Sequence, residues 1–256
     1  MARYQLTLAY DGSDFTGSQR QAKSRTVQGE LEKALHKLGW QGRSVVMAGR
    51  TDTGVHAIGQ VAAFDLNWSH ADDELLRALN AELPADIAVN EAHVASNDFH
   101  PRFDASSRRY LYKLFVHPVR DPLRERYAWR IWPALDQNKL YEAAQYFMGS
   151  HDFSAFGSPT TPAGSTIRTV IRSEWAQTED NEWRFQIQAD AFLYRMVRRL
   201  VFVQAAFAQG KVSAETLARS LAKQGSAGRR SGLISGLAPA HGLTLIEVTY
   251  QESKGH

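Results

Sequence analysis

Polar and apolar residues alternate near the start of the chain, over Arg3–Tyr10, which is the period of a β-strand with one buried face. Farther along, apolar residues recur at helical spacing between Val27 and Leu38. Thr26 is the expected N-cap of this helix and Gly39 its expected stop. No capping box is expected, because the third residue after Thr26 is a glycine. The pattern therefore predicts a strand followed by an amphipathic helix.

The rest of the first hundred residues extends this order. Val45–Ala48 and Gln60–Leu66 are typical of strands, and a second amphipathic helix, "DDELLRALNAEL", is ended by Pro84 and followed by a strand in "DIAVNEAHVA". Strand, helix, strand, strand, helix, strand is the ferredoxin-like, or split βαβ, order.

From Ser107 a similar order recurs, although the two halves share little sequence. It comprises a strand, "RRYLYKLFV", a helix, "LDQNKLYEAAQYFMG", a hairpin, "TIRTVIRSEWAQ" and "EWRFQIQAD", further helices and a last strand, "LTLIEVTY". We therefore predict an α+β fold of two ferredoxin-like halves, residues 1–105 and 106–256, whose strands form a central antiparallel sheet flanked by helices.

Composition narrows the class of protein. The chain has 256 residues, 43% of them hydrophobic, and no cysteine, which excludes disulfides, a cysteine nucleophile and cysteine-bound metal. No stretch approaches the roughly 18 uninterrupted apolar residues of a membrane span, and the first residues lack the apolar segment of a signal peptide. We expect a soluble, cytoplasmic protein.

Charge adds a candidate partner. The net charge is only +3, but basic residues cluster beside aromatic ones in "SSRRYLYK", "VRDPLRERYAWR" and "LYRMVRR", and again in "AGRR". Arginine and lysine neutralise phosphates and aromatic rings stack on bases, so these clusters are compatible with RNA binding. Solvated surface positions explain any single cluster equally well.

The segment "AGRTDTGVHAIGQV" interrupts two core-type strands with polar residues and glycines. In an extended chain Arg50 and Asp52 share one face and Thr51 takes the other, so a cation lies beside the carboxylate and favours its ionised form. Such an aspartate on a glycine-bounded loop suits nucleophilic or general-base chemistry. The alternative is a turn aspartate that binds only neighbouring backbone amides.

This segment is similar to the GRTDxGVHAxGQV signature of the bacterial tRNA pseudouridine synthases of the TruA family. The resemblance continues in family order through "LPADIAV", "FHPRFDASSRRYLYKL", "GSHDFSAF", "TIRTVIRS", "ADAFLYRMVRRLV" and "APAHGLTLIEVTY". It covers nearly the whole chain, and it implies the pseudouridine synthase fold.

The resemblance also implies roles for five residues. Asp52 matches the essential aspartate, which either attacks ribose C1′ or removes the C2′ proton. Arg50 matches the arginine that helps the target nucleotide leave the stem, and Arg198 matches the arginine that pairs with the catalytic aspartate. Tyr110 matches the tyrosine that stacks on uracil, and Leu243 matches an apolar wall residue. For Tyr110 and Leu243, a purely structural place in a strand remains the alternative.

The implied activity is isomerisation of uridine to pseudouridine at positions 38, 39 and 40 of the tRNA anticodon stem-loop, by a homodimer, with no metal and no organic cofactor. No water enters this reaction, which is why one carboxylate suffices where glycosidases need two. The alternative functions are a non-catalytic RNA-binding protein of the same fold and a related synthase acting on other uridines. Three departures from the family pattern, Ser18, Thr53 and Ala63, concern loop packing and the choice of tRNA.

Overall fold

The computed structural model describes residues 1–161, 163–178, 181–221 and 232–251, which form two compact units. One unit contains residues 1–106 together with the chain from Thr244 onward, and the other spans Ser107–Leu243. The basic pair in "AGRR" and most of the turn at 179–181 lie outside the described residues. Each unit combines mostly antiparallel strands with flanking helices, so the predicted α+β class is confirmed.

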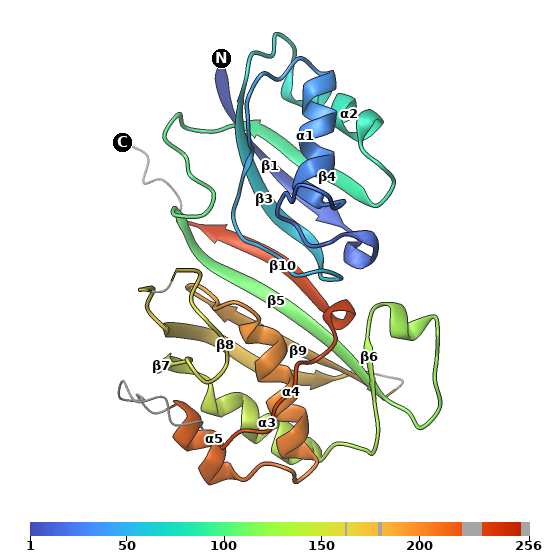
Figure 1. The fold of residues 1–256 in the computed structure, drawn as a ribbon, viewed down its shortest axis with the longest axis vertical. Coiled ribbons are helices and arrows are strands. Elements are labelled where there is room, and N and C mark those ends of the chain that lie inside the picture. The colour runs from blue at the N-terminus through green and yellow to red at the C-terminus, as the bar shows by residue number, and fades with distance from the viewer. Residues whose placement is uncertain (162, 179–180, 222–231, 252–256) are drawn as a thin grey trace. The chain divides into compact units, whose positions relative to one another are not determined.

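The first unit has the predicted order of elements (Figure 1): β1 (Ala2–Tyr10), α1 (Val27–Lys37), β2 (Val46–Met47), β3 (His56–Leu66), α2 (Asp72–Glu82) and β4 (Ile87–Val94). Strand β1 pairs antiparallel with β3 and β4, and β2 pairs antiparallel with β3. This is the strand arrangement of a ferredoxin-like half. The last strand, β10 (Leu243–Tyr250), adds a parallel pairing at the start of β3, with Thr244 opposite His56.

Apolar periodicity explains the core of this unit. The four alternating residues of β1 are buried, and helices α1 and α2 lie on one face of the sheet (Figure 1). The fully buried leucines come from the strand and from both helices: Leu6, Leu8, Leu31, Leu35, Leu75 and Leu79. As predicted, the Thr26 hydroxyl caps α1 by accepting from the Gly29 amide at 3.2 Å, and Gly39 adopts a φ of +87°.

The second unit repeats the helix and hairpin pattern with β5 (Ala105–Val116), β6 (Trp129–Ile131), α3 (Gln137–Tyr146), β7 (Gly149–Asp152), β8 (Ile167–Gln177), β9 (Glu182–Ala189), α4 (Met196–Ala208) and α5 (Ala214–Leu221). Its strands run in the order β5, β9, β8, β7, all antiparallel, and β6 pairs parallel with β5. Two hydrogen bonds fix β8 against the helices: the Ser173 hydroxyl donates to Ala144 in α3 and the Trp175 indole donates to Gln204 in α4.

Two strands have other bounds than the pattern predicts, and two short strands carry no signal in the sequence. The strand predicted at 45–48 is reduced to two residues, because only Val46 and Met47 pair with β3. The strand predicted to begin at Gln60 begins instead at His56, where β10 extends the sheet. Strands β6 and β7 were not predicted, because three or four residues are too few to show a period.

Candidate active site

The Asp52 loop, residues 48–55, connects β2 to β3 in the first unit. At its start, the Ala48 amide donates to Val61 of β3 at 2.8 Å, and at its end the Val55 amide donates to the Asp52 carbonyl at 3.1 Å. Gly54 lies inside that turn with a φ of +79°, a conformation that favours glycine. Asp52 thus lies at the entrance of a tight turn between two strands.

Burial alternates over residues 50–52 of this loop, as it does in an extended chain. Arg50 is exposed, Thr51 is 7% exposed, and Asp52 is half-buried. Arg50 and Asp52 therefore take the accessible side and Thr51 takes the core side, in agreement with the expected alternation. No described atom lies within 4 Å of the Cβ that another residue would place at Gly49, so this position is open.

The core side of the loop is held by a buried hydrogen-bond network around Thr51. The Tyr10 hydroxyl lies 2.9 Å from the Thr51 hydroxyl. The Gln60 side-chain amide donates to the Gly49 carbonyl at 3.0 Å and to the Tyr10 oxygen at 3.4 Å. Burial raises the pKa of Tyr10 to about 12, so the phenol stays neutral and its proton is available to Thr51. The Asp52 loop is thereby tied to β1 and to β3.

The turn that follows β1 also packs directly on the far end of the loop. A Cβ at Gly12 would lie 2.0 Å from the Val55 carbonyl oxygen, so only glycine fits there. The Gly12 amide donates to Nδ1 of His56, which is 6% exposed, at 3.0 Å. Nδ1 also lies 3.1 Å from Asp11 Oδ1, and protonation of Nδ1 would replace the bond from Gly12 with an ion pair to Asp11. His56 therefore faces the end of β1.

In the second unit, Tyr110 lies on β5 and is 9% exposed. The Phe192 ring meets it edge-on, with ring centroids 5.1 Å apart. An aromatic pair of this geometry contributes packing energy and restricts the ring. The stacking of Tyr110 on uracil stays a prediction.

Arg198, on the first turn of α4, supports the segment that leads to Leu243. Its Nε donates to the Ala238 carbonyl at 2.8 Å, and the Ala238 amide donates back to the Arg198 carbonyl at 3.2 Å. The neighbouring Tyr112 hydroxyl donates to the Pro239 carbonyl at 2.8 Å. Burial raises the pKa of Tyr112 well above its usual value, and the Arg198 charge acts in the opposite direction. Leu243 begins β10 and is 5% exposed.

The five expected site residues thus fall into two groups. Arg50 and Asp52 share one loop of the first unit, whereas Tyr110, Arg198 and Leu243 belong to the second. The pairing of Arg198 with Asp52 stays a prediction. Within the described ranges, no three His, Asp or Glu side chains are grouped as metal ligands, and no helix is both long and apolar enough to cross a membrane.

The sequence alone does not mark the residues that support the loop. Tyr10 and Gln60 are visible in the sequence only as members of predicted strands, and Ser18 only as a departure from the family pattern. Their position follows from contacts between segments far apart in sequence, 41 residues in the case of Tyr10 and Thr51.

Known proteins are similar to this chain over nearly its whole length. A family model described as tRNA pseudouridine synthase matches residues 7–104 and 143–251. A tRNA pseudouridine synthase A of Solidesulfovibrio magneticus is 43% identical, over 98% of this chain and 92% of its own length. A tRNA pseudouridine synthase A of Limosilactobacillus fermentum is 39% identical, over 98% of this chain and 96% of its own length.

Among solved structures, one chain in the crystal structure of a Cbf5–Nop10–Gar1 complex is similar, with 12% identity and a TM-score of 0.44. The match covers 98% of this chain and 50% of the solved one. The sequence matches carry the assignment: they identify the protein as an isomerase. The chain belongs to the tRNA pseudouridine synthase family. The resemblance seen in its motifs is thereby confirmed.

Proposed function

We propose that this protein isomerises uridine to pseudouridine at positions 38, 39 and 40 of the tRNA anticodon stem-loop, with Asp52 as its catalytic carboxylate. The observation that carries this proposal is the placement of Asp52. This residue is half-buried, directly follows the anchored Thr51, and lies on a glycine-bounded turn of the motif shared with the family. A carboxylate on a rigid support is what a reaction at a single ribose carbon needs.

The reaction balances with this one carboxylate. The bond between ribose C1′ and uracil N1 breaks, the uracil turns while bound, and a new bond forms between C1′ and C5. The C5 proton leaves and N1 gains a proton, so no atoms are added or lost. Asp52 either attacks C1′ and is later displaced, or removes the C2′ proton and later returns it, and in both routes it begins as the carboxylate anion.

The other residues bind and orient the nucleotide in this proposal. Arg50, exposed beside Asp52, helps the target nucleotide leave the stem, a step that every enzyme acting on a stacked base requires. Tyr110 stacks on the uracil, and Leu243 forms an apolar wall. Arg198 pairs with Asp52, supported by its bond to the Ala238 carbonyl.

We further propose that the enzyme works in the cytoplasm as a homodimer and uses neither metal nor organic cofactor. Light scattering after size-exclusion chromatography measures the oligomeric state directly. Turnover that persists in excess chelator is the result expected for a reaction carried by protein side chains alone.

The central experiment measures tritium released from C5-labelled uridine in an unmodified tRNA transcript, since only bond formation at C5 displaces that hydrogen. Wild-type protein should release tritium, with the modified nucleotides at positions 38 to 40. Asp52→Asn should release none while its affinity for tRNA stays within about twofold of wild type, because the substitution keeps the side-chain volume.

The matched control is Asp98→Asn, which removes the same charge from an exposed loop position in the same unit. This variant should keep wild-type turnover. Substantial turnover by Asp52→Asn would exclude Asp52 as the catalytic group. Tight tRNA binding without any release by wild type would instead favour the RNA-binding alternative.

A further inference from the structure

Ser18 is a buried residue that contacts the Asp52 loop through both its backbone and its side chain. Its side chain is fully buried, in a segment without regular strand or helix between β1 and α1. The Thr51 amide donates to the Ser18 hydroxyl at 2.8 Å, and the Ser18 amide donates to the Thr51 carbonyl at 3.1 Å. Both backbone polar groups of Thr51 are therefore bound by one residue, 33 positions away in sequence.

The residue before Ser18 shows how closely the two segments approach. Gly17 has a φ of +79°, and a Cβ there would lie 2.8 Å from the Thr51 carbonyl oxygen. The same position is 3.6 Å from the Asp52 carbonyl carbon. The 17–18 backbone thus packs directly against residues 51 and 52, so a displacement of Ser18 would displace the backbone that carries Asp52.

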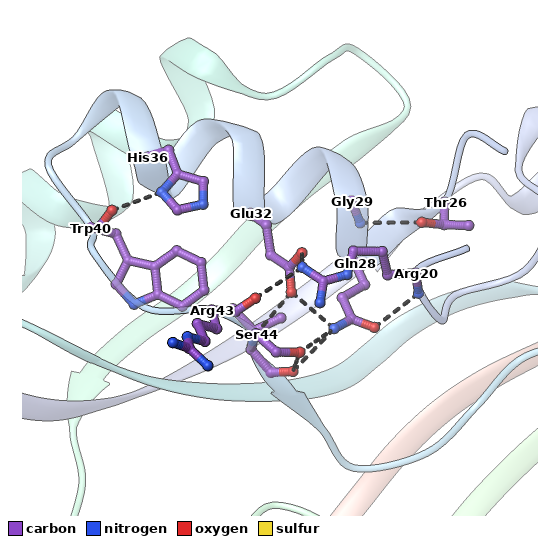
Figure 2. Close-up of polar contacts among 10 residues, drawn as sticks. Arg20, Thr26, Gln28, Gly29, Glu32, His36, Trp40, Arg43 and Ser44 are labelled. Carbon is purple, nitrogen blue, oxygen red and sulfur yellow. Dashed lines mark hydrogen bonds and ion pairs between the residues drawn. The ribbon is translucent and has the colours of Figure 1, made fainter. Parts of the chain in front are cut away.

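On its other side, Ser18 is fixed to helix α1. Its carbonyl accepts from the Gln28 amide at 2.9 Å. The Gln28 side chain is in turn held by the buried Glu32 carboxylate at 2.9 Å and by the Val45 carbonyl at 3.2 Å (Figure 2). Ser18 therefore connects a rigid, buried polar cluster on α1 with the Asp52 loop.

We propose that Ser18 is a positioning residue for Asp52, with its hydroxyl as the acceptor that fixes the Thr51 amide. This role rests on the proposed function of Asp52. Ser18 is also one of the departures from the family pattern, which usually has an aromatic residue at this position, and an aromatic ring places no hydroxyl on Cβ, where Ser18 accepts from Thr51. The hydroxyl is thus a feature of this chain's own loop support.

The test compares Ser18→Ala with wild type in single-turnover and steady-state tritium release. We expect kcat to fall roughly tenfold, because loss of the acceptor frees the loop to move and small misplacements of a reacting group are costly. The affinity for tRNA should stay within about twofold of wild type, because Ser18 is buried and out of reach of RNA. Ser18→Cys, with sulfur as a weak acceptor, should have a kcat between those of wild type and Ser18→Ala. It serves as the test if Ser18→Ala does not fold.

The matched control is Ser173→Ala, which removes another buried hydroxyl, 3% exposed, from β8 of the second unit. Ser173→Ala should lower the thermal midpoint by about as much as Ser18→Ala does, and it should leave kcat unchanged. An unchanged kcat in both Ser18 variants, or an equal loss in Ser173→Ala, would overturn the proposal.

Amide hydrogen exchange at Thr51 gives a readout independent of turnover. Exchange at this amide should be faster in Ser18→Ala than in wild type, whether or not the RNA substrate is the expected one. Unchanged exchange would contradict the role of Ser18, whereas failure of wild-type protein to release tritium would contradict only the proposed function.

Discussion

The buried carboxylate of Glu32 offers a stringent test of the polar cluster on α1. Glu32 is 4% exposed and accepts three hydrogen bonds: from Arg20 Nη1 at 2.7 Å, from Gln28 Nε2 at 2.9 Å and from the Val45 amide at 3.0 Å (Figure 2). Glu32→Gln replaces one carboxylate oxygen with an amino group. Gln28 and Val45 both donate to Oε1 and Arg20 donates to Oε2, so the new amino group takes the place of an acceptor and at least one of the three donors loses its partner.

The magnitude follows from these contacts. A hydrogen bond to a charged group contributes about 1.5–3 kcal/mol, and breaking a buried ion pair costs about 3–5 kcal/mol. The upper range does not apply, because the Arg20 side chain is 50% exposed and its charge can turn to water. We therefore expect Glu32→Gln to lower the free energy of unfolding by roughly 2–3 kcal/mol, which corresponds to about 4–10 °C in the midpoint.

Glu30→Gln is the control, since it makes the same substitution on the same helix. The Glu30 carboxylate, on a side chain that is 17% exposed, lies 2.9 Å from Lys33 Nζ and 3.7 Å from Arg25 Nε. Both basic side chains are open to water, at 71% and 37% exposed, so these pairs are screened. Their loss should cost less than about 1 kcal/mol. Thermal unfolding followed by circular dichroism compares the two variants. Equal shifts in both midpoints would refute the reasoning, because the buried carboxylate would then contribute no more than the one paired with an exposed lysine.

Two further predictions concern the contacts that β1 and the turn after it make with the Asp52 loop. The pKa of Tyr10 is raised from about 10 in the unfolded chain to about 12 in the folded one. Wild type should therefore lose roughly 2–3 kcal/mol of its free energy of unfolding as the pH rises from about 10 through about 12. Tyr10→Phe should lose less over the same pH range. Urea midpoints measured at successive pH values compare the two proteins. Gly12→Ala should lower the thermal midpoint severely, by about 3 kcal/mol or more, because its Cβ would meet backbone at 2.0 Å. Gly49→Ala, at an open position, should leave the midpoint near wild type, and equal midpoints in the two variants would contradict the close approach of Gly12 to Val55.

Much of the fold could be predicted because one physical signal, the burial of one face, determines each long element. The alternation over Arg3–Tyr10 predicts β1, and helical spacing with Thr26 as the cap predicts α1. Short elements carry no such signal. Strand β7 has the sequence Gly-Ser-His-Asp and exists because β8 offers a free edge for pairing, which the four residues themselves do not reveal. The shortening of β2 to two residues has the same cause, since pairing with β3 decides where the strand ends.

The support of the Asp52 loop shows where prediction from sequence stops. Thr51 is held by Tyr10 and Ser18, and Gln60 binds both Tyr10 and the Gly49 carbonyl. Tyr10 lies in β1, whose buried face follows from alternation, and Gln60 lies in β3, which pairs with β1, so their approach to the loop could in principle be derived from strand pairing. Ser18 lies in a segment without period, and its place depends on Gly17 adopting a positive φ and on Gln28 holding its carbonyl. A sequence reader therefore sees Ser18 only as a departure from a motif. Its amide and hydroxyl nevertheless both bind Thr51, a contact that no period in the sequence reveals.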